Sequence, residues 1–412
     1  MNITITPTKL TGTVTPPPSK SLAHRALIAA ALADGESVIS NVTFSQDIEA
    51  TLSCLDNLGA QFEQNGGTVT VHGMGASVMS PLRRMAYPQL NCGESGSTLR
   101  FLIPIALAVR GGGVFSGRGR LMERPQQPYF DIFDEKDIFH ELKDGVLTVT
   151  GTLSPGKYRL PGDVSSQFIT GLLYALPLRD GDSEIVLTSP LESRGYVDMT
   201  LDVLKTFGIS VTERENGYFI PGRQTYRPHS CAVEPDWSQA GFWFAAAALG
   251  SGLDVQGMKI PSTQGDWHFL DLLEQMHAAP ETEVDVSQYP DLVPPLAAVA
   301  ALRAGGSTRL TNAARLRIKE SDRLSSVTQV LNVLGADVEE GPDFLTIRGG
   351  EALRGGVAVD SFNDHRIAMM AAIAATRCRE PVTVLGAECV AKSYPDFWEE
   401  YEALGGKIQK SE

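Results

Sequence analysis

The sequence predicts an α/β protein of two domains, each built from three βαβαββ-like units around buried helices. Three observations support this prediction. Six Ala- or Leu-rich segments of helical length recur along the 412 residues, they are apolar nearly all round, and short β-branched runs follow most of them. A helix that is apolar on every face belongs inside a domain, and self-similarity at a fixed period indicates an array of similar structural units.

The six segments each open with a small polar or acidic cluster, at Ser19, Ser95, Ser165, Asp236, Asp291 and Asn363. Such residues cap helix N-termini, and a glycine usually follows each segment as a stop signal. The intervals between successive openings are 76, 70, 71, 55 and 72 residues. All intervals but one are therefore similar, which is the mark of a repeat.

A strand and a second helix complete each predicted unit. The β-branched runs, such as 37–42 and 183–188, predict strands that leave the buried helices toward one rim. Amphipathic helices then end at Leu-Gly-Ala or a close variant, as at 58–60, 207–209 and 334–336, and a glycine-containing hairpin follows in most units. The segment after Arg124 is short and lacks this ending, so we expect the second unit to be abbreviated there.

Six units are too many for one core of ordinary size, so three units in each of two domains is the natural division. Prolines mark the expected boundaries, at 16–18 and at Pro235. We expect one domain at 18–234 and the other at 1–17 plus 235–412, with the N-terminal strand pairing with the second half. Two independently joined α/β domains that do not close remain the alternative.

Composition limits the class of protein. With 42% hydrophobic and 20% charged residues, the chain is typical of a globular protein, and it has no apolar run long enough to cross a bilayer. The net charge of −14 argues against nucleic-acid binding, because a phosphate backbone favours a basic surface. The five cysteines are scattered without metal-binding spacing, and the N-terminus lacks the layout of a signal peptide. We expect a cytoplasmic monomer with no metal, membrane or nucleic-acid partner.

Polar and charged residues gather at two equivalent places in the repeat. One place is the start of the buried helix, with Lys20, Ser21, Arg25, 94–97, 165–167, Asp291 and 363–366. The other is the loop after the strand, with Arg120, Arg124, 193–196, 315–323 and 391–393. Helix N-termini offer free N–H groups and a positive dipole end, so converging helix starts predict an anion site. Each feature taken alone has a structural alternative. A simple N-cap is the alternative for each serine, and a solvated, salt-bridged face is the alternative for 315–323.

Two acidic residues lie among these basic residues. They are Asp291, at the start of a buried helix, and Glu320, beside Lys319. A carboxylate placed against a substrate hydroxyl acts as a general base, and a neighbouring acid can exchange a proton at carbon. A capping role for Asp291 is the alternative.

Five short sequences resemble the motifs of one enzyme family. They read PPSKSLAHRAL, VSSQF, KESDR, FNDHRIAM and AKSYPD, and they occur in the family's order between residues 16 and 396. Each is weak alone, but the set is specific. The chain therefore resembles the 3-phosphoshikimate 1-carboxyvinyltransferases, a family of enolpyruvyl transferases.

The resemblance implies two inside-out α/β domains that close like a clamp over 3-phosphoshikimate and phosphoenolpyruvate, with no metal or organic cofactor. It implies transfer of a carboxyvinyl group to the 5-hydroxyl of 3-phosphoshikimate in the shikimate pathway, with release of phosphate. Asp291 would take the hydroxyl proton, and Glu320 with Lys20 would handle the methylene proton.

The resemblance also implies two binding sets. The residues expected to bind 3-phosphoshikimate are Lys20, Ser21, Arg25, Ser165, Ser166, Gln167, Ser193, Tyr196, Asp291 and Lys319. Those expected to bind phosphoenolpyruvate are Lys20, Gly96, Arg124, Gln167, Arg323, Arg366 and Lys392.

The chain departs from the family pattern at Glu94 and Arg315, where asparagine is frequent. Both changes bear on affinity for phosphoenolpyruvate and for glyphosate, the family's inhibitor, without a predictable sign. Two other functions are alternatives. The sister transferase for UDP-N-acetylglucosamine carries Lys-Asn and a loop cysteine, whereas this chain has Lys20-Ser21 and no cysteine in 117–125. A non-catalytic anion-binding clamp would need Asp291 and Glu320 to be structural only.

Overall fold

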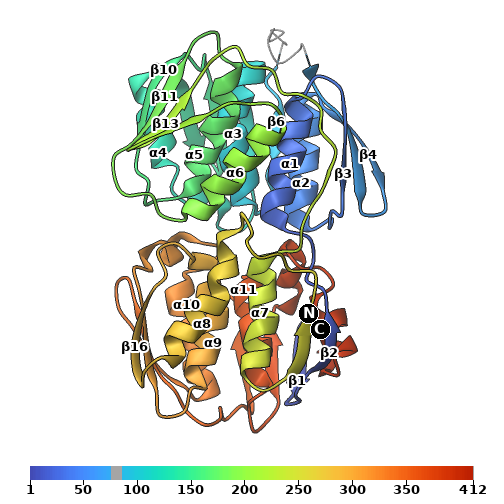
Figure 1. Ribbon diagram of the computed structural model, residues 1–412, viewed down its shortest axis with the longest axis vertical. Helices are drawn as coiled ribbons and strands as arrows, with labels where there is room; N and C mark the ends of the chain where they lie inside the picture. The colour runs from blue at the N-terminus through green and yellow to red at the C-terminus, as the bar shows by residue number, and fades with distance from the viewer. Residues whose placement is uncertain (76–85, 412) are drawn as a thin grey trace. The chain divides into compact units, whose positions relative to one another are not determined.

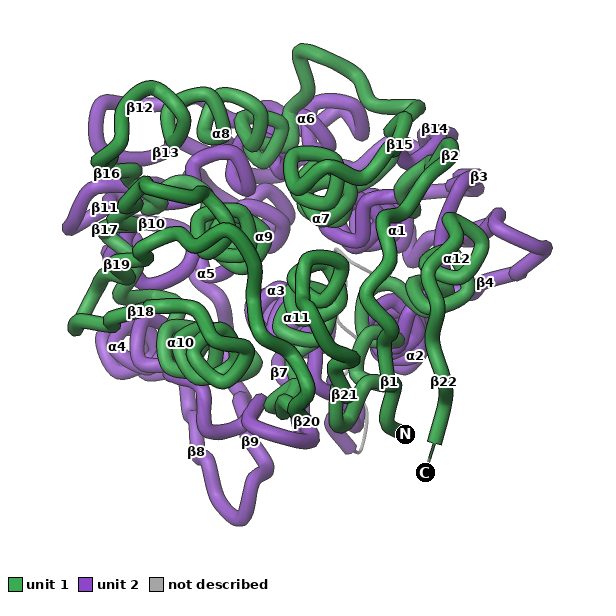
Figure 2. The backbone as a smooth tube through the Cα atoms, turned by 90° about the horizontal axis from the view of Figure 1, so that it is seen from below, with its two compact units in different colours: residues 1–17, 235–412 green, residues 18–234 purple. Residues whose placement is uncertain are grey.

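The computed structural model describes residues 1–75 and 86–411. The chain forms two compact units, shown in different colours in Figure 2. Unit 1 comprises Met1–Pro17 with Pro235–Glu412, and unit 2 comprises Pro18–Glu234. Each unit has a hydrophobic core of its own. In each, a set of helices is flanked by sheets (Figure 1).

In the described part of unit 2, three buried helices occupy the middle, and an amphipathic helix follows each of them in the chain. The buried helices are α1 (Lys20–Leu32), α3 (Gly96–Arg110) and α5 (Ser166–Ala175), and the amphipathic helices are α2 (Gln46–Leu58), α4 (Gln127–Glu135) and α6 (Arg194–Thr206). The side chains of Ser19, Ser95 and Ser165 cap the three buried helices by accepting backbone N–H bonds. Helix α2 ends at Gly59, whose φ of 112° is the left-handed conformation that suits glycine.

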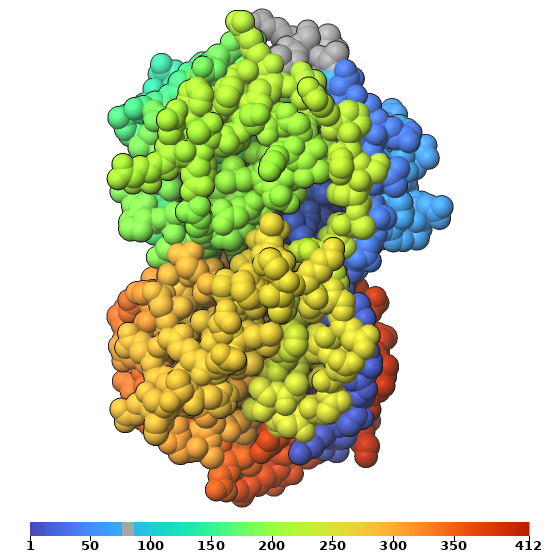
Figure 3. Space-filling view, in the orientation of Figure 1, coloured from blue at the N-terminus to red at the C-terminus, as the bar shows by residue number. Residues whose placement is uncertain are grey.

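The described strands of unit 2 form three sheets. They are β3 (Glu36–Ser40), β4 (Gln61–Asn65), β5 (Thr68–His72), β6 (Gln89–Asn91), β7 (Gly112–Ser116), β8 (Phe139–Lys143), β9 (Val146–Thr150), β10 (Gly156–Leu160), β11 (Ser183–Leu187), β12 (Thr212–Arg214), β13 (Gly217–Ile220) and β14 (Cys231–Ala232). The sheet orders are β14-β3-β5-β4, β6-β7-β9-β8 and β10-β11-β13-β12. Each has a parallel first pair and an antiparallel hairpin. The second repeat is complete but short, since α4 has 9 residues against 13 in α2. The third repeat contains α5, α6 and the sheet β10-β11-β13-β12. Its side chains, drawn in green, form much of the unit 2 face seen in Figure 3.

Unit 1 repeats this plan. Its buried helices are α7 (Trp237–Ala248), α9 (Val293–Ala301) and α11 (His365–Ala375), accompanied by α8 (Phe269–His277), α10 (Arg323–Leu334) and α12 (Phe397–Ala403). Asp236 caps α7. Helix α11 is capped by Asp364 and not by Asn363, so the sequence placed this helix start one residue early. Helix α9 is preceded by the 3₁₀ turn η5 (Pro290–Leu292), which contains Asp291.

Strands from both ends of the chain complete the sheets of unit 1. The strands are β1 (Asn2–Thr6), β2 (Thr11–Val14), β15 (Gly252–Val255), β16 (Glu281–Asp285), β17 (Ser307–Thr311), β18 (Asp337–Glu340), β19 (Leu345–Arg348), β20 (Val357–Asp360), β21 (Val382–Leu385) and β22 (Lys407–Ser411). The sheet orders are β16-β17-β19-β18, β20-β21-β1-β22 and β15-β2. Strand β1 pairs antiparallel with β21 and β22, which confirms that the N-terminal strand joins the second half. No hairpin lies between α8 and β16, where every residue is described, and this explains the 55-residue interval.

The predicted α/β class is thus confirmed. Helix α3 packs against α5 in unit 2, and α9, α10 and α11 pack against one another in unit 1.

Candidate active site

Lys20 is the first residue of α1, and its ammonium lies 2.7 Å from the carboxylate of Asp47 in the first turn of α2. The two side chains are 16% and 11% exposed. An ammonium held at the start of a helix, where N–H groups are free, favours an anionic ligand. Asp47 was not among the site residues predicted from the sequence, although an acidic residue in the first turn of a helix was a signal that could have identified it.

The buried guanidinium of Arg25 joins α1 to α6. Its Nε donates to Thr200 Oγ1 at 2.9 Å, and its two terminal nitrogens donate to the carbonyls of Ser21 and Tyr196, each at 2.8 Å. Burial lowers the pKa of Arg25 to about 10, so the side chain stays charged at neutral pH. In this structure Arg25 therefore fixes the backbone of two other residues of the predicted 3-phosphoshikimate set.

The guanidinium of Arg124 lies against the first residue of α3. A Cβ atom at Gly96 would lie 2.7 and 2.9 Å from the two terminal nitrogens of Arg124. Ser95 caps the same turn, with its Oγ 3.1 Å from the N–H of Thr98. Glycine at 96 thus allows a buried cation to approach a helix N-terminus closely.

The side chain of Gln167 links the start of α5 to α3. Its Oε1 accepts from Arg100 at 2.9 Å, and its Nε2 donates to Ser97 Oγ at 3.1 Å. Ser165 caps α5 by accepting from the N–H of Gln167 at 3.3 Å, and Ser166 is buried beside it. Arg100 was not among the site residues predicted from the sequence, although an arginine inside an apolar helix was a signal that could have identified it.

Ser193 and Tyr196 stand at the start of α6. Ser193 is 2% exposed and adopts φ of 53°, and its carbonyl accepts from the N–H of Tyr196 at 3.1 Å. The left-handed conformation is strained for serine, and such strain is often kept at functional sites.

In unit 1, the carboxylate of Asp291 forms ion pairs with three cationic side chains. Its oxygens lie 2.8 Å from Arg323, 3.1 Å from Arg366 and 3.5 Å from Lys319. Asp291 makes no side-chain cap for η5 or α9, so the capping alternative is wrong. An acid that already faces three cations marks a place where anionic groups are favoured.

Arg323 is the centre of this cluster. It is 1% exposed and also lies 2.7 Å from Glu320 and 2.8 Å from Asp364. A buried guanidinium with three carboxylates is not a solvated surface, so the solvated alternative for this part of 315–323 is wrong. Arg323 orients both acids that the sequence singled out.

Burial shifts two ionisable groups near Asp291. It lowers the pKa of Lys319 to about 8, while Asp291 acts in the opposite direction. Burial and the charge of Asp291 together raise the pKa of Asp266 to about 7. Asp266 lies in the turn η4 (Gly265–His268), is 3% exposed, and accepts a hydrogen bond from Ser238 on α7. Asp266 could not be identified from the sequence, because a single acid in a loop carries no periodic signal.

Lys392 is buried at the end of η7 (Ala387–Lys392), and its ammonium donates to the Asn363 carbonyl at 2.6 Å. The next residue, Ser393, accepts from the amide of Gln239 on α7 at 3.1 Å. Lys392 is thereby held beside the start of α11, which carries Arg366.

The two departures from the family pattern have defined surroundings. The carboxylate of Glu94 lies against the turn at Gly119, where a Cβ atom would approach Oε2 to 2.7 Å. Arg315, in the turn η6 (Ala314–Ile318), donates to the carbonyl of Ser287 and is 9% exposed. The guanidinium of Arg315 is thus held by a residue 28 positions away in the sequence.

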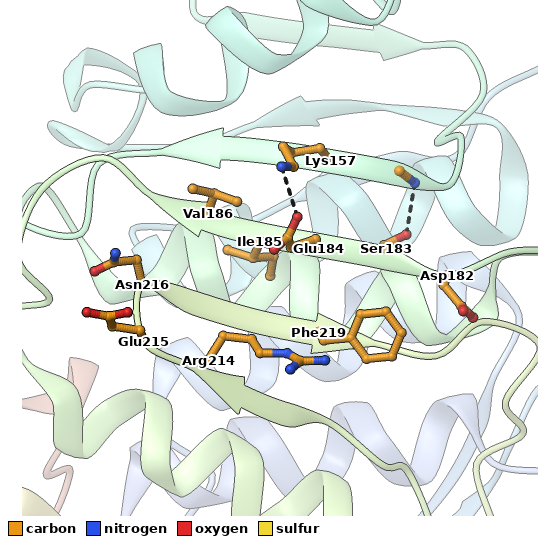
Figure 4. A pocket seen from close by; sticks show the side chains of 11 residues that line it. Lys157, Asp182, Ser183, Glu184, Ile185, Val186, Arg214, Glu215, Asn216 and Phe219 are labelled. Atoms are coloured by element: carbon orange, nitrogen blue, oxygen red, sulfur yellow. Dashed lines mark hydrogen bonds and ion pairs between the residues drawn. The ribbon is translucent and has the colours of Figure 1, made fainter.

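A surface pocket of about 680 Å³ lies elsewhere, over the sheet that contains β10 and β11 (Figure 4). Lys157 and Glu184 form an ion pair of 3.1 Å across it, and Arg214 lies over the ring of Phe219. Among its described lining residues, none belongs to the predicted binding sets.

Within 1–75 and 86–411, no group of three or more His, Cys, Asp or Glu side chains could hold a metal ion. In that same part of the chain, helices fall short of the length and apolarity that spanning a membrane needs.

Comparisons with known proteins agree with one another. A family model described as EPSP synthase (3-phosphoshikimate 1-carboxyvinyltransferase) matches residues 5–401. The 3-phosphoshikimate 1-carboxyvinyltransferase of Clostridium kluyveri is 46% identical over 99% of this chain and 98% of its own, and that of Clostridium perfringens is 44% identical over 99% of both. The solved EPSP synthase of Acinetobacter baumannii superposes with a TM-score of 0.80 at 27% identity, over 99% of this chain and 100% of its own.

Proposed function

Because the chain belongs to the EPSP synthase family, we propose that it transfers the carboxyvinyl group of phosphoenolpyruvate to the 5-hydroxyl of 3-phosphoshikimate. The products are 5-enolpyruvylshikimate 3-phosphate and phosphate, and the reaction is a step of the shikimate pathway. The observation that best supports the proposal is the cluster at Asp291, where an acid capable of accepting a proton faces three cations.

The proposed chemistry begins with Asp291, which takes the proton of the 5-hydroxyl. The oxygen of this hydroxyl then attacks C2 of phosphoenolpyruvate. Glu320 and Lys20 exchange the proton at the methylene carbon, first to form the tetrahedral intermediate and then to expel phosphate and restore the double bond. Cations fixed before the reaction stabilise the anionic groups without reorganising. The phosphoenolpyruvate set supplies them through Arg124, Arg323, Arg366 and Lys392.

Unit 2 carries most of the residues proposed to bind 3-phosphoshikimate, namely Lys20, Ser21, Arg25, Ser165, Ser166, Gln167, Ser193 and Tyr196. Unit 1 contributes Asp291 and Lys319 to this set, and it also carries Glu320, which is proposed to be catalytic only. We further propose a monomer in the cytoplasm that needs no cofactor. The five cysteines form no disulfide in the described residues, which suits a reducing compartment.

Phosphate release tests the proposal. Purified protein is mixed with phosphoenolpyruvate and either 3-phosphoshikimate or UDP-N-acetylglucosamine, and we expect release with 3-phosphoshikimate only. Release with the nucleotide sugar would favour the sister transferase, and binding without release would favour the non-catalytic clamp.

Asp291→Asn tests the proposed base. The amide keeps the shape of the side chain but cannot accept the proton, so we expect kcat to fall by roughly 10²- to 10⁴-fold. Asp254→Asn, an exposed acid on β15, is the control and should leave kcat unchanged. Equal activities of the two variants would exclude Asp291 as the base.

A further inference from the structure

A buried row of polar side chains connects α1, α2 and α3 in unit 2. His24 Nδ1 lies 2.8 Å from Thr51 Oγ1, Thr51 Oγ1 lies 2.6 Å from Thr98 Oγ1, and Thr98 Oγ1 lies 2.7 Å from Ser95 Oγ. All four residues are at most 1% exposed. None of the four belongs to the predicted binding sets, so the proposed reaction leaves this row unexplained.

The direction of the hydrogen bonds follows from counting protons. A hydroxyl has one proton to donate. Thr98 donates its proton to Ser95 Oγ, so Thr51 must donate to Thr98. The proton of Thr51 is then used, and His24 must donate from Nδ1. The row therefore selects the tautomer of His24 that carries its proton on Nδ1.

The other ring nitrogen of His24 bears no proton. Nε2 is buried and has no hydrogen-bond partner among the described residues. Burial lowers the pKa of His24 well below its usual value, and the charges of Lys20 and Arg25 lower it further. His24 is therefore a neutral donor, although it lies on a helix whose start is cationic.

The row ends at the first turn of α3, where two residues proposed to bind phosphoenolpyruvate make contact. Arg124 lies against Gly96, and Gln167 donates to Ser97. Thr98 holds the same turn from the inside, since both its N–H and its hydroxyl donate to Ser95. A shift of this turn would displace both contacts together.

We propose that His24 is a positioning residue which, as the Nδ1–H tautomer and through Thr51 and Thr98, fixes the first turn of α3 for phosphoenolpyruvate. The inference rests on the proposed function. His24 itself touches no substrate, and its effect reaches the reaction only through the threonines.

Thr51→Val is the sharpest test, because valine keeps the shape of threonine and removes the hydroxyl in the middle of the row. We expect the KM for phosphoenolpyruvate to rise roughly fivefold, as for the loss of one buried hydrogen bond, with kcat and the KM for 3-phosphoshikimate unchanged. The control is Thr376→Val, which deletes a buried hydroxyl bonded at 2.7 Å to the Ile373 carbonyl at the far end of α11. Its KM values should stay at the wild-type level.

Two variants of His24 separate the donor from the ring. His24→Asn retains an N–H donor near the position of Nδ1 and should keep the KM for phosphoenolpyruvate close to that of the wild type. His24→Leu removes the donor and should raise that KM as Thr51→Val does. An equal rise of both KM values in Thr51→Val, or no rise, would overturn the proposal.

Long-range ¹H–¹⁵N NMR of the wild-type protein provides a readout independent of activity. The chain has seven histidines, and His24→Asn identifies the signal of His24. We expect a protonated Nδ1 and a bare Nε2 across neutral pH, whereas an Nε2–H tautomer or an imidazolium would overturn the inference. Absence of turnover in the wild type would count against the proposed function, while the tautomer could still be read.

Discussion

At Gly96 the space for a side chain is already filled by the guanidinium of Arg124, which would lie within 3 Å of a Cβ atom. A Cβ atom essentially never lies this close to another heavy atom, so a methyl group there must displace Arg124. The position shows how a single hydrogen in place of a side chain can decide where a cation lies.

We therefore expect Gly96→Ala to raise the KM for phosphoenolpyruvate by about tenfold or more, through displacement of a charged group that costs about 1.4 kcal/mol or more. Steady-state kinetics at saturating 3-phosphoshikimate measure this effect. Gly145→Ala in the turn between β8 and β9 has open space around it and serves as a control for activity, although its positive φ of 74° costs some stability. Unchanged kinetics in Gly96→Ala would contradict the assigned role of Arg124.

Lys319 should give the substrate affinity a pH dependence. Burial lowers the pKa of its ammonium to about 8 in the free protein, so the charged form that would bind 3-phosphoshikimate is lost as pH rises through that value. We expect the KM for 3-phosphoshikimate to increase above about pH 8 in the wild type. In Lys319→Arg this increase should disappear, since a guanidinium stays charged. An identical rise in both proteins would assign it to another group.

At the residue scale, the sequence could identify side chains that stand in short motifs at helix starts, and it could not identify their supports. Lys20, Gln167 and Asp291 were singled out because their residue types are unusual at the openings of apolar segments. Arg100 and Asp266 were not, because their importance comes from contacts with residues far along the chain.

At the scale of elements, one buried ion pair ties the start of α10 to the start of α11. Arg323 Nε donates to Asp364 at 2.8 Å, and Asp364 in turn caps α11 through the N–H of Arg366 at 3.0 Å. Burial would raise the pKa of Asp364, but Arg323 outweighs it and lowers the pKa below the usual value. The two helix starts are thus held in register by charge as well as by apolar packing.

Asp364→Asn isolates the contribution of that charge, because asparagine can still cap α11. We expect the free energy of unfolding to fall by roughly 3 kcal/mol, since a buried guanidinium loses a partner. Asp337→Asn removes an acid from an exposed pair with Arg348 and should leave the free energy of unfolding close to that of the wild type, because exposed pairs contribute little. Denaturant titrations of the two variants would refute the argument if their losses were equal.

The elements themselves were largely predictable from local pattern, since apolar segments with polar openings became helices and β-branched runs became strands. The start of α11 was placed one residue early, because Asn363 and Asp364 are both good capping residues and only the backbone decides between them. Asn363 takes φ of 53°, which leaves Asp364 as the cap.

At the scale of the whole molecule, the chain begins in unit 1, forms unit 2 and then returns. Strand β1 inserts between β21 and β22, and its Ile3 and Ile5 are fully buried. All strands of the three sheets of unit 2, by contrast, come from 18–234. The two units therefore depend differently on distant parts of the sequence.

We expect residues 18–234 expressed alone to show a cooperative thermal transition, and residues 235–412 alone to show none, since they lack β1 and β2. A permuted chain that joins 235–412 to 1–17 through a short flexible linker should restore cooperativity. The linker can be short because Asn2 pairs with Ser411 at the ends of antiparallel strands. Circular dichroism melts of the three polypeptides measure this, and a cooperative melt of 235–412 without 1–17 would contradict it.

The α/β class, the repeat and the motif residues can be predicted from local patterns, because hydrophobic periodicity, capping chemistry and short motifs are local properties of a chain. Tertiary structure alone decided which groups meet. It placed Arg323 on three carboxylates, Arg124 on Gly96, and His24 at the end of a row of hydroxyls. Apart from the contact with Glu320, these contacts join residues 27 to 41 positions apart, and no local pattern encodes them. They arise because buried polar groups must find partners inside a packed core.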